Sequence, residues 1–259
     1  MTTGARIFKQ SAFLLIFLII IGLFSFFVWR ISSSEPVVIA PTPTPLFSIE
    51  TLSTKILKVG DSGYDILIKA RNPNPLAGVA RADYSISLIG QDDTEVGTVS
   101  GYTYFSPGQT KFIVVSPIDS TKEIKDAIVS FNPENWSEDL KISPSSISLI
   151  PLKYDLSFAS VPGSFASVKG TLRNVSDYNL NKVDLVVMLF DKNGEVFRVG
   201  RSSLRTLLAK ENRDFSITWF NSFSETVDRI EVEAYTNVSD EQNFIKSSGD
   251  SVEKFQEMQ

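Results

Sequence analysis

The feature that most limits how this chain can fold is an internal repeat. Apolar residues recur at every second position in Tyr64–Asn72, and Phe165–Asn174 repeats the alternation at a spacing of 100 to 103 residues. Both stretches end in Arg-Asn, at Arg71-Asn72 and Arg173-Asn174. Because the side chains of a β-strand point to opposite faces in turn, this alternation indicates half-buried strands. We therefore expect two copies of one β-rich unit.

The strand that follows in each copy alternates in the same way. Its apolar residues occupy every second position of Asp83–Leu88 in copy one, and copy two has Leu185, Val187 and Leu189 at those positions. Turn residues come next, at Gly90–Asp93 and at Asp191–Gly194, where Asn193-Gly194 favours a tight hairpin because both residues tolerate positive φ. About seven short strands per copy, separated by such turns, predict an antiparallel β-sandwich.

Ala12–Trp29 is an uncharged and almost wholly apolar run of 18 residues. A helix of this length is about 27 Å long, close to the thickness of the hydrocarbon core of a bilayer. Arg6 and Lys9 precede the run and Arg30 follows it, and this excess of positive charge predicts a cytoplasmic N-terminus and an exported C-terminal part. We expect an uncleaved, single-pass signal anchor in the lipid bilayer of the cell membrane. The alternative is a cleaved signal peptide with its site at Val38–Ala40.

The remaining boundaries follow from composition. We expect a cytoplasmic tail at 1–11, a transmembrane helix at 12–29, and at 30–46 a linker rich in proline and serine, which favours an extended polyproline II conformation. The linker could instead be a proline-rich ligand for an aromatic groove. We place the first sandwich at 47–140, the second at 141–239 and a flexible tail at 240–259. Superposing the copies should pair Ile68 with Gly170 and Ile86 with Val187.

Composition excludes several kinds of chemistry. The chain has no cysteine and no histidine, so it lacks disulfides, thiolate nucleophiles, the commonest general base and the commonest metal ligand. Its 25 basic and 30 acidic residues give a net charge of −5, and because three of the basic residues precede residue 31, the remainder carries −8. This charge argues against nucleic acid as a partner. We expect no catalytic set, no metal site and no cofactor, and predict that the protein is not an enzyme.

Short motifs in both copies resemble known families. Val187–Asp191 resembles the F-x-L-Y-D signature of the FxLYD family, with valine for phenylalanine and phenylalanine for tyrosine. Arg71–Pro75 is similar to the Asn-Pro-Asn turn of the type 2 late-embryogenesis-abundant (WHy) domains. The resemblance covers roughly Phe47–Asn237 and implies immunoglobulin-like sandwiches, exported or membrane-tethered in a bacterium, without catalytic residues. The expected fold class is all-β, with two tandem immunoglobulin-like antiparallel β-sandwiches behind one N-terminal transmembrane helix.

Two groups of residues are candidates for contact with a partner. Asn72, Pro73, Asn74 and Pro75 lie in the loop 72–78, whose prolines reduce the entropy lost when the loop is ordered on binding. The alternative for this loop is a turn that only joins two strands.

The second group is Tyr102 and Tyr104, which share one face of a strand. An exposed pair could stack on a sugar or on a protein, whereas an inward pair would be part of the core. Separately, Asp92, Asp93 and Glu95 could offer oxygen ligands to calcium or form a solvated turn.

Three hypotheses for function follow. The first is a membrane-anchored, extracytoplasmic and non-catalytic interaction or scaffold protein of the cell envelope, with a protein partner there. The second is a glycan-binding module of the envelope, which an exposed Tyr102–Tyr104 pair would favour and a buried pair would weaken. The third is a hydrolase, which would need a cleft with convergent carboxylates of shifted pKa.

Overall fold

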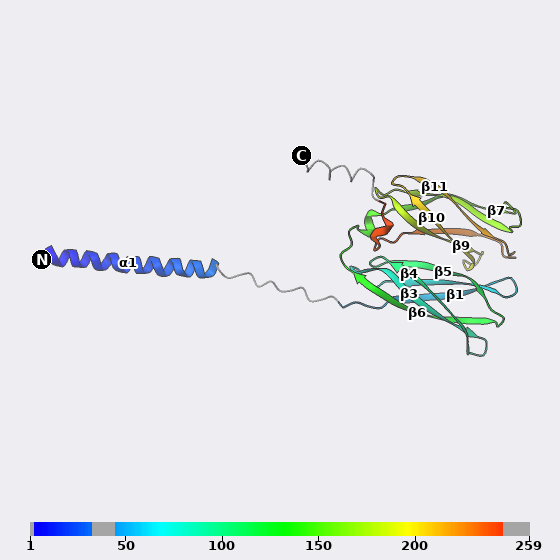
Figure 1. Ribbon diagram of the computed structural model, residues 1–259, viewed down its shortest axis with the longest axis horizontal. Coiled ribbons are helices and arrows are strands. Elements are labelled where there is room, and N and C mark those ends of the chain that lie inside the picture. The colour runs from blue at the N-terminus through cyan, green and yellow to red at the C-terminus, as the bar shows by residue number, and fades with distance from the viewer. Residues whose placement is uncertain (1–2, 33–44, 246–259) are drawn as a thin grey trace, which may run out of the picture. The chain divides into compact units, whose positions relative to one another are not determined.

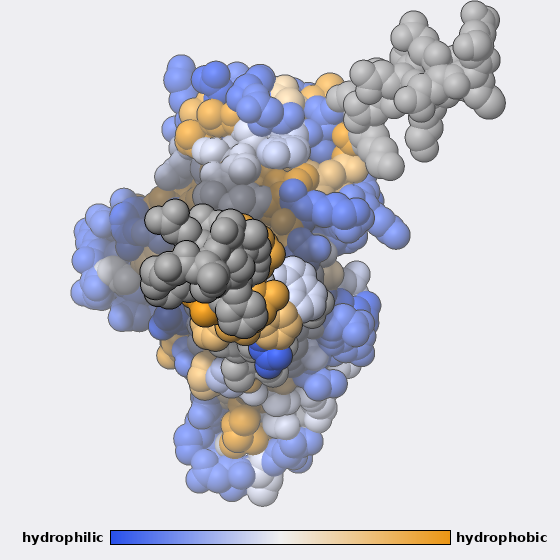
Figure 2. Space-filling model, turned by 90° about the vertical axis from the view of Figure 1, so that its left-hand side faces the viewer, coloured by the Kyte–Doolittle hydropathy of each residue, from blue (hydrophilic) through white to orange (hydrophobic). Residues whose placement is uncertain are grey.

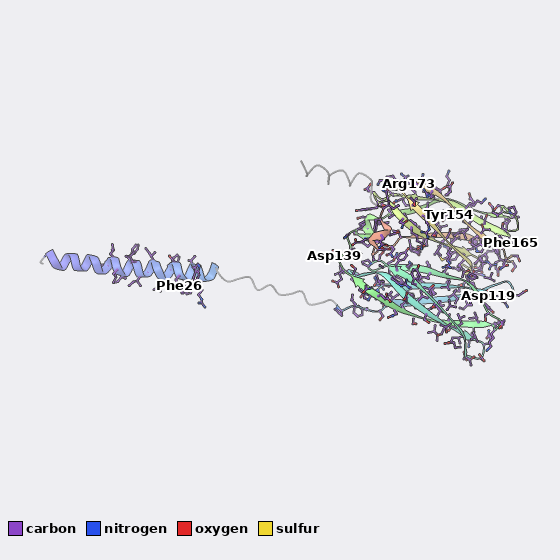
Figure 3. The ribbon with its side chains drawn as sticks, in the orientation of Figure 1. Phe26, Asp119, Asp139, Tyr154, Phe165 and Arg173 are labelled. Carbon is purple, nitrogen blue, oxygen red and sulfur yellow. The ribbon has the colours of Figure 1, made fainter. Side chains whose placement is uncertain are left out.

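The computed structural model describes residues 3–32 and 45–245, which belong to two compact units, Met1–Pro45 and Leu46–Gln259. In the first unit, helix α1 spans Thr3–Ser32. Its segment Phe13–Arg30 is exposed and is long and apolar enough to cross a membrane, a property that signal sequences share. Figure 3 shows Phe26 projecting from this helix. Residues 33–44 of the predicted linker and 246–259 of the predicted tail lie outside the described residues.

The second unit is all-β and confirms the predicted fold class. Each copy contributes six strands rather than about seven. The strands of the first sandwich are β1 (Glu50–Val59), β2 (Gly63–Arg71), β3 (Gly78–Gly90), β4 (Glu95–Phe105), β5 (Thr110–Asp119) and β6 (Ile124–Ser137). Those of the second are β7 (Leu149–Phe158), β8 (Ala166–Asn174), β9 (Leu180–Phe190), β10 (Val196–Leu207), β11 (Asn212–Trp219) and β12 (Arg229–Tyr235).

The two sandwiches have the same topology. In the first, the strands are ordered β1-β2-β5 in one sheet and β4-β3-β6 in the other; in the second, the corresponding orders are β7-β8-β11 and β10-β9-β12. All paired strands are antiparallel, and the register agrees as well as the order. The predicted superposition is confirmed by two matched sets of opposed residues, Ile68–Ile113 with Gly170–Phe215 and Ile86–Val99 with Val187–Gly200.

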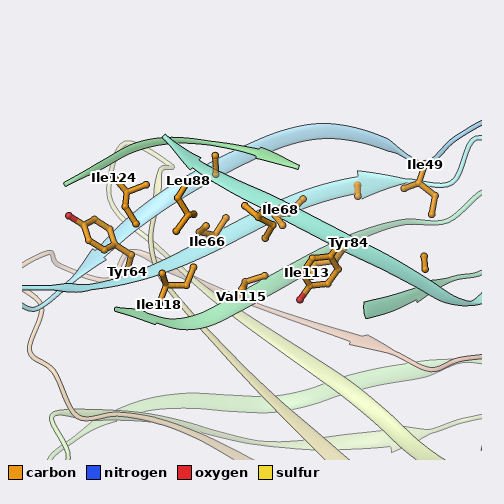
Figure 4. Close-up of a cluster of buried hydrophobic side chains, with 14 of the residues drawn as sticks. Ile49, Tyr64, Ile66, Ile68, Tyr84, Leu88, Ile113, Val115, Ile118 and Ile124 are labelled. Atoms are coloured by element: carbon orange, nitrogen blue, oxygen red, sulfur yellow. The ribbon is translucent and has the colours of Figure 1, made fainter. Parts of the chain in front are cut away.

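Each sandwich has a core of its own. Ile66, Ile68 and Ile86 are fully buried between the sheets of the first sandwich, where Figure 4 shows the cluster that includes Ile66 and Ile68. Val168 and Leu189 are fully buried in the second. Burial of one such side chain contributes about 1.5–3 kcal/mol relative to exposure, so the alternating apolar residues account for why each copy closes into a sandwich.

A third apolar cluster, which we call the seam, joins the two sandwiches. It brings Leu67 and Val114, on the outer face of sheet β1-β2-β5, against Met188 and Phe190, on the outer face of sheet β10-β9-β12. The four sheets therefore form four layers, and Figure 1 shows one sandwich above the other. The buried members of the seam are Leu57, Leu67, Val114, Val186, Met188, Phe190, Val199 and Tyr235, with Tyr104, Phe112 and Val196 partly buried against them.

The second sandwich extends beyond its last strand, which corrects the predicted tail. A short 3₁₀ turn, Glu241–Asn243, folds back, and Phe244 forms a bridge with Leu180. The buried Asn243 side chain accepts a hydrogen bond from Lys182 N at 2.9 Å and donates to Thr236 Oγ1 at 2.7 Å. The flexible tail expected from residue 240 is therefore wrong for 240–245, because a buried amide anchors these polar residues.

Candidate functional site

The loop expected to bind a partner is mainly a structural turn. Asn72 is fully buried, and its Nδ2 donates to Ala77 O at 2.7 Å and to Ser106 O at 2.9 Å. Its Oδ1 accepts from Asn74 N at 3.0 Å, and Asn74 is buried as well. These two residues are therefore not free to contact a partner, which corrects their proposed role. Pro73 is half-buried, and the exposed part of the loop is Pro75 together with Leu76.

The second copy has a buried asparagine with matching hydrogen bonds. Asn174 is fully buried, and its Nδ2 donates to Tyr178 O at 2.8 Å and to Leu208 O at 2.9 Å. Its Oδ1 accepts from Ser176 N at 3.0 Å. In both copies one asparagine ties the chain that leaves the second strand to the turn between the fourth and fifth strands. The repeated Arg-Asn of the sequence thus marks a feature of the fold, not a binding site.

Replacing either asparagine with alanine should destabilise its sandwich. Asn72→Ala leaves two buried carbonyls and one N–H without their partner, and Asn174→Ala leaves two part-buried carbonyls and one N–H. We expect a loss of about 2–4 kcal/mol in the free energy of unfolding. Urea denaturation of residues 46–259 measures this loss. Leu76→Ser, at an exposed position of the same loop, is the control and should change the value by less than about 0.5 kcal/mol. Unchanged stability in Asn72→Ala would contradict this structural role.

The two tyrosines share a face of β4 but not an environment. Tyr102 is 65% exposed, and the Arg81 guanidinium lies over its ring at 4.3 Å from the centroid. Tyr104 lies at the seam, where its hydroxyl donates to Asp184 Oδ2 at 3.0 Å. Packing of the second sandwich against the first covers one ring and leaves the other open. The pair therefore forms no common platform, which weakens the glycan hypothesis at this position.

Lys111 is a buried cation beside the seam. Its Nζ lies 3.6 Å from the centroid of the Tyr104 ring and donates to Tyr104 O at 3.2 Å. Burial lowers the pKa of Lys111 to about 7, although Asp184 favours the charged form. Burial also raises the pKa of Tyr104 and of Tyr235, whose hydroxyl accepts a hydrogen bond from Phe112 N at 3.0 Å. Ionisable groups thus line the contact between the sandwiches.

Two open grooves run along the contact between the sandwiches. The first has a volume of ≈ 490 Å³ and is lined by residues that include Tyr102, Lys111 and Asp184. The second has a volume of ≈ 570 Å³ and is lined by residues that include Asp65 and Arg198. Both volumes lie within the roughly 300–1,000 Å³ typical of ligand sites. Both grooves combine buried charges with accessible walls.

The acidic turn considered for calcium is satisfied within the chain. Asp92 Oδ1 accepts from Thr94 N at 3.2 Å, and Asp93 pairs with Lys125 at 2.7 Å. Glu95 accepts from Thr98 Oγ1 at 2.9 Å. Within residues 3–32 and 45–245, no three His, Cys, Asp or Glu side chains gather in a group that could hold a metal ion.

Sequence reasoning missed Asp65, Lys111 and Arg198, the charged residues that the fold buries. Each has an apolar neighbour in its strand, such as Ile66 next to Asp65, Phe112 next to Lys111 and Val199 next to Arg198. A charge within an apolar strand is a usable signal, because a buried charge is costly unless the structure provides partners. The pattern alone does not tell which partners these are.

Comparisons with known proteins add little. No protein-family model matches the sequence, and no curated protein matches it. Among solved structures, the chain is similar to red sea bream transglutaminase, with a TM-score of 0.20 and 8% identity. The likeness covers 73% of this chain and 29% of that one. A likeness at this level bears on neither the family nor the function of this protein.

Proposed function

We propose that this protein is a membrane-anchored, extracytoplasmic, non-catalytic interaction or scaffold protein of a bacterial cell envelope. The observation that carries the proposal is the order of parts. A helix of membrane-spanning length and composition precedes a unit in which two sandwiches are packed together and leave strand edges open. Such edges are natural sites for strand addition by a protein partner.

Charge supports the orientation in this proposal. Arg6 and Lys9 lie ahead of the candidate span, so the short N-terminal tail is cytoplasmic under the positive-inside rule. The part after the span is acidic, and hydrophilic residues occupy much of the outer surface visible in Figure 2. An acidic surface favours a basic or neutral partner, with association that weakens as salt rises.

The equivalent edge strands β1 and β7 are the surfaces that we assign to the partner. In the described sheets, β1 pairs only with β2, and β7 pairs only with β8. Each strand also exposes apolar side chains, with Leu52 on β1 and Ile150 and Phe158 on β7. Unpaired backbone groups beside exposed apolar side chains suit recognition of an extended peptide segment.

A single experiment tests both location and binding. Because the chain has no cysteine, Ile150→Cys introduces one unique thiol on the edge strand β7. A membrane-impermeant maleimide that carries a photoreactive benzophenone should label this variant in intact cells and, after illumination, crosslink it to a discrete protein partner. Thr2→Cys, in the tail before the span, should be labelled only after the membrane is permeabilised.

Leu208→Cys is the matched control for the edge. Leu208 is also exposed but lies in the turn between β10 and β11 and not on either edge strand. It should be labelled as efficiently as Ile150→Cys and should not give the same crosslinked partner. Exclusion of the maleimide from Ile150→Cys in intact cells contradicts the exported orientation. The same crosslink from Leu208→Cys contradicts binding at the edge, and turnover of a substrate by the purified protein contradicts a non-catalytic role.

We also propose that both copies are related to the FxLYD and WHy families. The support is that Asn72, which belongs to the motif similar to WHy domains, and Asn174, which precedes the motif similar to FxLYD, make matching hydrogen bonds. A common ancestral unit with a buried asparagine after its second strand accounts for this equivalence.

A further inference from the structure

The second groove contains a buried cation that the fold leaves incompletely paired. Arg198, on β10, is 2% exposed and lines the groove. Its Nη2 donates to Ser222 O at 3.1 Å and to Asn221 O at 3.4 Å. Among the described residues, its Nε and Nη1 have no hydrogen-bond partner. A buried guanidinium usually satisfies its fork of five N–H donors, so the fold leaves two donors of Arg198 unsatisfied beside the groove.

An acid faces the same groove from the other sandwich. Asp65, on β2, is 6% exposed and also lines the groove. Among the ion pairs of the described residues, none joins Asp65 to Arg198. Burial raises the pKa of Asp65, against the opposing effects of Ser116, Arg198 and Arg201. The groove thus presents a hydrogen-bond acceptor and hydrogen-bond donors that are near each other but not paired directly.

An exposed aromatic residue stands at this groove. Phe220, just after β11, is 66% exposed and lines the groove beside the buried Trp219. The exposed carboxylate of Asp119 lines it as well. Figure 3 places Asp119 at the end of the sandwiches opposite Asp139. Solvent therefore reaches the groove, and a ligand that enters it meets an open aromatic ring.

The charges of the groove select the class of ligand. An anion would meet Asp65 and Asp119, and a cation would meet Arg198 and Arg201, so neither sign is favoured. A neutral molecule with neighbouring hydroxyl groups meets no repulsion. Each hydroxyl can donate to Asp65 and accept from Arg198, because a hydroxyl is both a donor and an acceptor. The apolar C–H face of a sugar ring can also lie on Phe220, and pockets that combine aromatic walls with a few polar groups are typical ligand sites.

We propose that this groove, which we call the Arg198 groove, binds a neutral saccharide. Adjacent hydroxyls bridge the Arg198 guanidinium and the Asp65 carboxylate, and the ring packs on Phe220. Residues from both sandwiches are needed, so the seam builds the site by holding β2 and β10 together. This inference goes beyond the proposed scaffold function and stands apart from Tyr102 and Tyr104, where a glycan was first considered.

Ligand-observed saturation-transfer NMR on the full-length chain in lipid nanodiscs tests the proposal. The probes are methyl α-glucoside, methyl α-mannoside and N-acetylglucosamine, with acetate and ethylammonium as charged comparators. At least one saccharide should bind with a dissociation constant of about 1–10 mM, as expected for a small ligand with few polar contacts. Acetate and ethylammonium should give weaker signals than that saccharide.

Three variants assign the signal to the groove. Phe220→Ala removes an exposed ring, and Asp65→Asn removes a charge at constant shape; each should weaken saccharide binding at least about fivefold. Phe47→Ala, which removes an exposed ring just before β1 that does not line the groove, is the matched control and should leave binding unchanged. Thermal melting checks that each variant is folded.

Several results would overturn the proposal. Absence of a signal from all three saccharides at concentrations up to about 50 mM would exclude a useful affinity. A stronger signal from acetate than from any saccharide would make the Arg198 groove an anion site instead. Equal losses in Phe47→Ala and Phe220→Ala, or full binding in a folded Asp65→Asn variant, would place the saccharide elsewhere.

Discussion

Leu189→Asp is expected to unfold the second sandwich. Leu189 is fully buried between the two sheets of that sandwich, and its neighbours on β9 at every second position, Leu185 and Val187, are fully buried as well. An aspartate there would place an unpaired carboxylate in an apolar core, which costs several kcal/mol and is comparable to the whole stability of a domain. Circular dichroism and urea denaturation of residues 46–259 should show a loss of about 4 kcal/mol or more.

Met188→Asp, one residue earlier, should have a different effect. Met188 is equally buried, but it belongs to the seam and not to either core. The chain can relieve the buried charge by separating the sandwiches, so each sandwich should remain folded while the pair opens. Small-angle X-ray scattering should report a larger radius of gyration with little change in circular dichroism. Unfolding of both variants to the same extent would show that the sandwiches are not independent of the seam.

Lys111→Met is expected to remove a dependence of stability on pH. The pKa of Lys111 is about 7 in the folded chain, well below its ordinary value of 10.5. Between these two values the unfolded chain binds more protons than the folded chain, so stability rises with pH in this window and the penalty is fully present below about pH 7. For the unmodified protein, the free energy of unfolding should rise by roughly 3 kcal/mol between pH 7 and about pH 9.5.

In Lys111→Met this rise should fall to less than about 1 kcal/mol, and the variant should be more stable than the parent at pH 6 by roughly 3 kcal/mol. Lys182→Met is the control, because Lys182 pairs with the same Asp184 at 2.8 Å but is exposed. It should keep most of the rise, since burial, the largest cause of the lowered pKa of Lys111, is unchanged and only the smaller effect of the Lys182 charge is lost. Measurements stop near pH 9.5 because the raised pKa values of Tyr104 and Tyr235 lower stability at higher pH. A Lys111→Met variant that retains the full rise would contradict this assignment.

The sequence by itself determined the architecture of each copy. A period of two in Tyr64–Asn72 and in Asp83–Leu88 states which side chains share a face, and apolar faces must be buried against another sheet. The spacing of the repeat determined that both copies have one topology. The predictions of the number of strands and of the end of the second sandwich were less accurate. Bulges, turns and a buried amide such as that of Asn243 leave little trace in the periodicity of the sequence.

Only the tertiary structure decided how the two copies meet. The uninterrupted apolar run Leu185–Phe190 shows that both faces of β9 are buried, yet it does not say that Met188 and Phe190 pack on Leu67 and Val114. Met188 and Phe190 lie more than a hundred residues after Leu67 in the sequence. A period of two carries no information about contacts between strands so far apart.

The same limit applies to every candidate site. The position of the second sandwich separates Tyr104 from Tyr102, buries Lys111, and brings Asp65 to the groove that Arg198 lines. The local sequence shows only that each of these residues is polar or aromatic. For Asn72, expected to contact a partner, the structure shows instead a buried side chain that hydrogen-bonds within the fold. Periodicity predicts which side chains share a face of a sheet, because that depends only on residues that are close together in the chain. The sites depend on contacts between the two sandwiches, which only the folded chain defines.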